Sequence, residues 1–233
     1  MEAVERLYSA GHDVLFVTNF STLPRRESEN RLERIGIDAR DRVITSAMAA
    51  ASLVEPGERV LVCGGPGVVE AVEERGAEVV ESGPADVVVV GYHRDFDYEG
   101  MARAARAIHG GARLVATNSD PTYPTSAGLL PGNGALVAAV ATAGMVEPTV
   151  AGKPHAPVAE LIRSRLGRRP ATGGRPVVVG DLPATDGLLA RRLGYRFALV
   201  LSGVTSADQV ATAEPPADLV APDLAELVDR LVG

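Results

Sequence analysis

The stretch RPVVVGDLPATDGLLARRLG, residues 175–194, decides the fold class. It predicts a buried strand over residues 175–181, followed by a helix that begins near Thr185. A strand core made only of valines is typical of a parallel sheet that helices cover on both faces. Open parallel sheets bind their ligands where the strands end, and Asp181 stands at that point.

Apolar strands and helical segments alternate along the whole chain. The expected strands are residues 13–18, 59–64, 86–91, 113–118, 175–181 and 196–201. Two segments rich in proline and glycine, residues 55–57 and 123–134, are candidate domain crossings. The sequence has no fixed-period repeat, and the alternation predicts an α/β fold built on parallel sheets.

The composition is that of an ordinary globular domain, with 46% hydrophobic and 23% charged residues in a chain of 233. No apolar run approaches the roughly 18 residues of a membrane helix, and Glu2 and Glu5 stand where a signal peptide would be basic and apolar. We therefore expect a cytoplasmic protein with no membrane partner. The formal charge of -7 argues against a nucleic-acid partner, and the single cysteine, Cys63, is expected to be a core residue.

Lys153 stands out because it is the only lysine among 23 basic residues. It follows a short apolar run, and an ammonium group at a strand end can neutralise a bound phosphate. A solitary lysine is more often a solvated surface residue, so by itself it leaves both interpretations open.

Two other polar clusters follow predicted strands. Thr18 and Asn19 precede a helix start, where a hydroxyl and free backbone N–H groups could bind phosphate, or the side chains could bond only to their own backbone. Asp181 and Asp186 could hold Mg²⁺ directly or through water. The alternative for Asp186, or for Thr185 before it, is capping of the next helix.

Three further patterns are weak signals. Gly65 and Gly67 follow a strand as in a dinucleotide-binding turn, but Glu70 stands where the third glycine belongs. Asp95 and Asp97 are interpreted as residues at the start of a helix rather than as a catalytic pair. The four histidines have no metal-ligand spacing, so the sequence predicts no zinc site.

Three motifs occur in a fixed order: VTNFS at 17–21, AGKPH at 151–155 and VVGDLPATDG at 178–187. With the α/β segment between the first two, they resemble the haloacid dehalogenase-like phosphatases of subclass IIA, the group of NagD, p-nitrophenylphosphatase and phosphoglycolate phosphatase. The resemblance covers essentially the whole chain. It includes the cap-type sequences at 86–108 and 112–140.

The resemblance implies a doubly wound, Rossmann-like core over residues 1–56 and 147–233, with an α/β cap inserted at 57–146. It also implies Mg²⁺-dependent hydrolysis of a small phosphorylated metabolite through an aspartyl-phosphate. A homodimer through the cap would be compatible with such an architecture.

The resemblance also implies a role for each polar cluster. The implied site comprises Thr18 and Asn19 for binding the phosphoryl group, Lys153 for stabilising its charge, Asp181 for ligating Mg²⁺ with Asp186 in support, and the cap stretch from Asp120 to Tyr123 for substrate contacts. In chemical terms, cations and backbone donors would neutralise the charge of a transferring phosphoryl group.

One departure from the family pattern concerns the nucleophile. Members of this family begin with an apolar strand ending in Asp-x-Asp-Gly, whose first aspartate is the nucleophile and whose second is the general acid. The sequence contains no such motif, so we expect the first core strand of the family to be absent from it. The helical segment at residues 1–11 has no capping residue before it, and we expect the coding sequence to continue upstream of Met1. Phe20 and Leu182 are smaller departures.

Two alternatives to a phosphatase follow. The chain could be a non-catalytic remnant that binds a phosphorylated ligand or a protein partner, because Thr18, Lys153 and Asp181 are present without a nucleophile. A nicotinamide-dependent enzyme would rest on the imperfect glycine turn alone.

Overall fold

The structure, a computed structural model, describes residues 2–167 and 175–232, which group into two units. The first unit contains Met1–Phe16, Glu29–Arg42 and Lys153–Gly233, and the second contains Val17–Ser28 and Val43–Gly152. The second unit includes the whole expected cap. The expected boundaries at residues 57 and 146 stay a prediction.

A five-stranded sheet in the order β4-β3-β5-β6-β9 organises the second unit. Its strands are β3 (Arg59–Cys63), β4 (Glu78–Val80), β5 (Val87–Val90), β6 (Arg113–Ala116) and β9 (Thr149–Val150). All neighbouring pairs run parallel, and Val87 lies opposite both Val60 and Arg113. The four valines of β5 are fully buried, which confirms the prediction of a parallel sheet covered on both faces.

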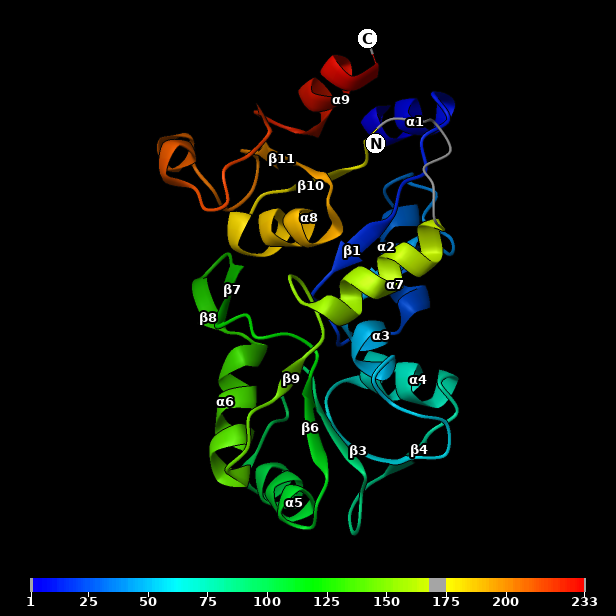
Figure 1. Cartoon of the computed structure of the whole chain (residues 1–233), viewed down its shortest axis with the longest axis vertical. Helices are drawn as coiled ribbons and strands as arrows, with labels where there is room; N and C mark the ends of the chain where they lie inside the picture. Colours follow the sequence, from blue (N-terminus) through cyan, green and yellow to red (C-terminus); the bar gives the residue numbers. More distant parts are fainter. Residues whose placement is uncertain (1, 168–174, 233) are drawn as a thin grey trace. The chain divides into compact units, whose positions relative to one another are not determined.

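Helices α5 (Tyr98–His109) and α6 (Asn133–Gly144) lie side by side on one face of this sheet (Figure 1), where their apolar side chains pack against β3, β5 and β6. Helices α3 (Ser46–Ala51) and α4 (Pro66–Glu74) complete the unit's longer elements. Asp97 caps α5 by accepting a hydrogen bond from the Gly100 N–H at 2.7 Å, as expected of a helix-start residue. Cys63 is a core residue, and burial raises the pKa of its thiol to about 11.

A three-stranded parallel sheet organises the first unit in the order β10 (Val177–Gly180), β11 (Arg196–Val200) and β12 (Leu219–Ala221). The other elements that lie wholly within this unit are α1 (Glu2–Ser9), α7 (Ala156–Leu166), the π-helical turn η1 (Pro183–Gly187), α8 (Leu188–Leu193), the 3₁₀ helix η2 (Ala207–Thr212) and α9 (Leu224–Val232). Phe197 in the central strand is fully buried, whereas Val179 in β10 is 38% exposed. The prediction of complete burial is therefore wrong for β10, because an edge strand has a neighbour on one side only.

Strand β1 (Phe16–Thr18) lies within the expected strand at residues 13–18, and α2 (Arg25–Glu33) follows it as expected. The partner of β1 in a two-stranded sheet, β2 (Val43–Thr45), was not expected. Strands β7 (Thr122–Thr125) and β8 (Gly128–Pro131) form an antiparallel hairpin. The segments 55–57 and 123–134 both lie within the second unit, and the second of them contains the β7–β8 hairpin; their role as domain crossings stays a prediction. No helix of the described residues is long and apolar enough to cross a membrane.

Candidate active site

Lys153 and Asp186 form a partly buried ion pair in the first unit. The Lys153 Nζ donates to Asp186 Oδ1 at 2.7 Å, and the two side chains are only 16% and 7% exposed. The other carboxylate oxygen of Asp186 accepts a hydrogen bond from the Leu182 N–H at 3.2 Å. The chain's only lysine is therefore held by a carboxylate close to the end of β10 instead of lying in solvent.

The helix-cap alternative does not hold for Asp186 or Thr185. Neither η1 nor α8 has a side-chain hydrogen bond at its N-cap residue. The Thr185 hydroxyl donates instead to the Leu182 carbonyl at 3.4 Å. Asp186 thus lies inside η1 with its carboxylate directed to Lys153 and to the start of the turn.

Asp181 follows β10 directly and is held by the loop after β11. One carboxylate oxygen, Oδ2, accepts the Val204 N–H at 2.8 Å, and the Asp181 carbonyl accepts the Thr205 hydroxyl at 2.5 Å. The second carboxylate oxygen has no hydrogen bond within the part of the chain that is described. A half-buried carboxylate with one such oxygen fits Mg²⁺, which binds through one or two carboxylates and retains several waters. The described residues contain no group of three His, Cys, Asp or Glu side chains that could hold a metal by themselves.

Asn19 lies in the second unit, in the loop after β1. Its Nδ2 donates to both carboxylate oxygens of Asp120, at 3.0 and 3.2 Å. Its carbonyl accepts hydrogen bonds from Ser46 Oγ at 2.6 Å and from Asn118 Nδ2 at 2.7 Å. The Thr18 hydroxyl oxygen accepts the Phe20 N–H at 3.0 Å, a local backbone contact that does not use the donor of the hydroxyl, so the phosphate-binding role of Thr18 stays a prediction.

Tyr123 belongs to a cluster of three side chains that the sequence interpretation recognised only in part. Its hydroxyl lies 2.7 Å from that of Tyr92, and Arg94 Nη2 donates to it at 3.5 Å. These hydrogen bonds, first from Tyr92 and then from Arg94, hold the pKa of Tyr123 below its usual value. Tyr92 and Arg94 could have been found by the argument applied to Asp181, because both follow the end of β5.

The glycine turn after β3 has a packing explanation. A Cβ on Gly67 would lie 2.1 Å from the Leu23 carbonyl oxygen, and a Cβ on Gly65 would lie 2.6 Å from Thr22 Cγ2. The Gly67 N–H donates to the Thr22 carbonyl at 2.8 Å. The glycines therefore allow the loop after Asn19 to approach α4. The Gly67 N–H donates to the Thr22 carbonyl and is not available to a ligand.

The structure thus brings the predicted residues into two groups. Lys153 and Asp186 pair in the first unit, which also contains Asp181. Asn19 and Asp120 pair in the second unit, which also contains Thr18 and Tyr123. The joint action of Thr18, Asn19 and Lys153 on one phosphoryl group stays a prediction.

The chain resembles known proteins over both its halves. A family model described as haloacid dehalogenase-like hydrolase matches residues 1–78, and one described as HAD-hydrolase-like matches residues 150–227. An acid sugar phosphatase of Staphylococcus saprophyticus is 32% identical over 221 residues, which are 93% of this chain and 84% of that protein. The chain belongs to the haloacid dehalogenase-like hydrolases.

Other relatives of this hydrolase are also phosphatases. The D-glycerol 3-phosphate phosphatase of Mycobacterium tuberculosis is 39% identical over 91% of this chain, but the match spans only 61% of that protein. The structure of p-nitrophenyl phosphatase from Archaeoglobus fulgidus covers 98% of this chain with 90% of its own length, at 30% identity and a TM-score of 0.90. A glycerol phosphate phosphatase of Mycobacterium tuberculosis in complex with magnesium has a TM-score of 0.87 at 37% identity, over 96% of this chain and 69% of its own.

The predicted α/β fold and family are therefore confirmed for this hydrolase. Its polar groups suit the chemistry of an oxyanion. A partly buried lysine supplies positive charge where solvent screens it less than at the surface, and amide donors supply hydrogen bonds of defined direction. A metal would add a second positive charge beside Asp181.

Proposed function

We propose that this hydrolase is a Mg²⁺-dependent phosphomonoesterase that acts on a small phosphorylated metabolite. The observation that carries the proposal is the ion pair of Lys153 with Asp186. A lysine held at one position by a buried carboxylate is prepared to meet a dianionic phosphoryl group. The names of the relatives, which are phosphatases for sugar phosphates and glycerol phosphate, support the same reaction class.

In the proposed reaction, an aspartate carboxylate oxygen forms a bond to phosphorus while the P–O ester bond breaks, and the substrate leaves as an alcohol after its oxygen takes up a proton. Water then attacks the phosphorus of the aspartyl-phosphate, which releases inorganic phosphate and restores the carboxylate. Thr18 and Asn19 bind the oxygens of the phosphoryl group, and Lys153 stabilises the charge that develops on them. Asp186 positions the lysine, and Asp181 holds the metal. When bound, Mg²⁺ supplies positive charge to the phosphoryl oxygens.

The aspartate that accepts the phosphoryl group is not assigned to a residue of this sequence. The printed sequence contains no Asp-x-Asp-Gly motif. This favours one second candidate, a protein that binds a phosphorylated ligand without turning it over. Both candidates use Lys153, so binding and turnover must be measured separately.

The test is hydrolysis of p-nitrophenyl phosphate with Mg²⁺ and with a chelator, by this chain and by a form extended upstream in its reading frame. Lys153→Met is expected to lower kcat at least about 100-fold, because the developing charge loses its cation. This substitution leaves Asp186 buried without a partner, so the double variant Lys153→Met/Asp186→Asn is measured beside it. Arg191→Met is the control, since Arg191 pairs with Asp218 on the surface of the same unit.

Each result separates the candidates. Hydrolysis that needs Mg²⁺ and Lys153 supports the phosphatase, and activity of the extended form alone assigns the nucleophile to the extension. Absence of hydrolysis in both forms contradicts the phosphatase. Calorimetric binding of inorganic phosphate that Lys153→Met abolishes would then support the non-catalytic candidate.

A further inference from the structure

Asn133, the first residue of α6, has surroundings that packing alone does not explain. Its side chain is 2% exposed. Its Nδ2 lies 2.8 Å from the Asn118 carbonyl, 3.2 Å from Thr117 Oγ1 and 3.4 Å from the Val90 carbonyl. All three groups stand at the ends of β5 and β6, so one side-chain amide ties two strand ends together.

The amide oxygen of Asn133 has no partner. Oδ1 is the one buried side-chain nitrogen or oxygen of the described residues without a hydrogen bond. Turning the amide over would not help, because the oxygen would then face the Asn118 and Val90 carbonyls. The contacts of Nδ2 therefore fix the orientation of this amide, and its oxygen makes no contact that would do so.

The contacts of Asn133 lead to the loop after β1 by two routes. Thr117 Oγ1 donates to Ser21 Oγ at 3.2 Å, and both side chains are fully buried. Asn118 Nδ2 donates to the Asn19 carbonyl at 2.7 Å, and Asn118 Oδ1 accepts the Asp120 N–H at 3.1 Å. One intervening residue, Asn118, thus connects Asn133 to both partners of the Asn19–Asp120 hydrogen bond.

The two glycines that flank Asn133 hold the same region from the backbone. The Gly132 N–H donates to the Pro121 carbonyl at 2.8 Å, and the Gly134 N–H donates to the Asp120 carbonyl at 2.9 Å. A Cβ would lie 2.3 Å from the Asp120 oxygen at Gly132 and 2.6 Å from the Ser119 oxygen at Gly134. Only glycine allows the start of α6 to approach the chain at Asp120 this closely.

We infer that Asn133 is a positioning residue for Asn19, acting through Thr117 and Asn118. All the residues on these routes lie in the second unit. The inference rests on the proposed role of Asn19 in binding the phosphoryl group. Through its carbonyl, which accepts two hydrogen bonds, the peptide that follows Asn19 is held in one orientation.

The first test is independent of turnover. Amide hydrogen exchange is measured at Phe20, whose N–H belongs to the held peptide, in the wild type and in Asn133→Ala. We expect exchange at Phe20 to rise about tenfold or more, while the amides of β3 keep their protection. Thr142→Val is the matched control, because Thr142 is an exposed residue of the same helix.

The second test measures function. The Kd for inorganic phosphate should rise about tenfold in Asn133→Ala, and kcat/KM for p-nitrophenyl phosphate, in the form that is active, should fall about 10- to 100-fold. Asn133→Asp adds a pH readout: its carboxylate offers no donor at neutral pH, but the protonated form offers one. Its activity relative to the wild type should therefore recover as the pH falls.

Unchanged exchange at Phe20 together with an unchanged Kd for phosphate would overturn the inference. If Asn133→Ala does not fold, Asn133→Asp at neutral pH replaces it, since its carboxylate offers no donor there and the same rise in exchange at Phe20 is expected; an unchanged exchange rate is equally decisive. A wild-type protein without hydrolysis would contradict the proposed function alone, because exchange and phosphate binding test the positioning role directly.

Discussion

The two ends of the five-stranded sheet in the second unit use different polar chemistry. At the amino ends of β3, β5 and β6, charged side chains meet near the surface, and Arg113 binds Glu58 through two hydrogen bonds of 2.6 and 2.8 Å. At the carboxyl ends, neutral amides and hydroxyls such as Asn133 and Thr117 meet in the interior. The first end is arranged for stability and the second for holding a loop.

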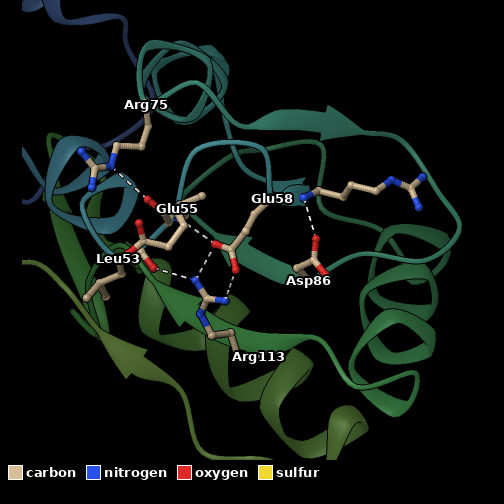
Figure 2. A network of polar contacts seen from close by, with 8 residues as sticks. Leu53, Glu55, Glu58, Arg75, Asp86 and Arg113 are labelled. Atoms are coloured by element: carbon tan, nitrogen blue, oxygen red, sulfur yellow. Dashed lines mark hydrogen bonds and ion pairs between the residues drawn. The ribbon is translucent and has the colours of Figure 1, made fainter.

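Figure 2 shows the charged end. Arg113 also donates to the Leu53 carbonyl at 2.7 Å, and the Glu58 carboxylate accepts the Glu55 N–H at 2.7 Å. The hydrogen bond from Arg113 is the main reason that the pKa of Glu58 is lowered to about 2. The Arg113 and Glu58 side chains are 45% and 21% exposed, so solvent and salt weaken the pair.

Solvent and salt do not weaken the hydrogen bonds of the neutral end in this way. Its donors and acceptors are buried, and a buried group that loses its partner carries the full penalty of desolvation. Neutral donors at this end add no charge to the loop after β1, where Asn19 already contacts the Asp120 carboxylate. The difference teaches that mutations at the two ends should differ in size and in their dependence on pH and salt.

The largest effect is expected from Gly67→Ala at the neutral end. The added Cβ would meet the Leu23 carbonyl oxygen at 2.1 Å, and backbone cannot move aside as a side chain can. We expect a loss of about 3 kcal/mol or more in the free energy of unfolding by urea, or displacement of the loop with loss of phosphate binding.

Gly57→Ala at the charged end is the control for this variant. Gly57 has a φ of +84° and open space around its Cβ position, so alanine there should cost about 1 kcal/mol through its backbone conformation alone. Equal losses for the two variants would show that the close approach at Gly67 is not what makes glycine necessary.

A smaller effect is expected from Glu58→Gln at the charged end. At pH 7 and low salt, the free energy of unfolding of this variant should be about 0.5–1 kcal/mol lower than that of the wild type. Because the folded-state pKa of Glu58 is about 2 and its ordinary value is 4.5, this contribution is present above about pH 4.5 and disappears as the pH falls toward 2.

Urea unfolding of the wild type and Glu58→Gln at pH 7 and near pH 2, each at low and high salt, measures this. The two proteins should converge in acid. Glu78→Gln is the control, because the Glu78 side chain is 66% exposed and its carboxylate lies 3.9 Å from Arg59 Nε. The free energy of unfolding of this variant should differ little from that of the wild type. A difference between wild type and Glu58→Gln that persists near pH 2 would contradict the role assigned to the carboxylate.

The smallest effect on stability is expected from Tyr123→Phe, which tests the cluster of Tyr92, Arg94 and Tyr123. Tyr123 should ionise below the usual tyrosine range in an ultraviolet absorbance titration, and Tyr123→Phe should remove this early step. Arg94→Gln should move the step to higher pH, because the phenolate loses a donor. If Tyr123→Phe still shows an ionisation below the usual tyrosine range, that ionisation belongs to another tyrosine. Tyr98→Phe, at an exposed position on α5, is the control.

Local patterns predicted the features that depend on neighbours in the chain. The valines of β5 and the capping role of Asp97 followed from apolar runs and short-range hydrogen bonding. The edge position of β10 was missed, because a run of valines looks alike in a central strand and an edge strand. The glycine turn at Gly65 and Gly67 was a weak signal, because its cause lies in a segment more than 40 residues away, at Thr22 and Leu23.

The α/β class, the family and the residue types available for phosphate chemistry could be predicted from the chain, because they depend on periodicity and on the order of short motifs. The partners of these residues are visible only in three dimensions: Lys153 with Asp186, Asn19 with Asp120, and Asn133 with the ends of two strands. Residues 101 positions apart, such as Asn19 and Asp120, share no local pattern. Their contact exists because packing of the sheet and its helices brings distant strand ends together, and that packing depends on the whole chain.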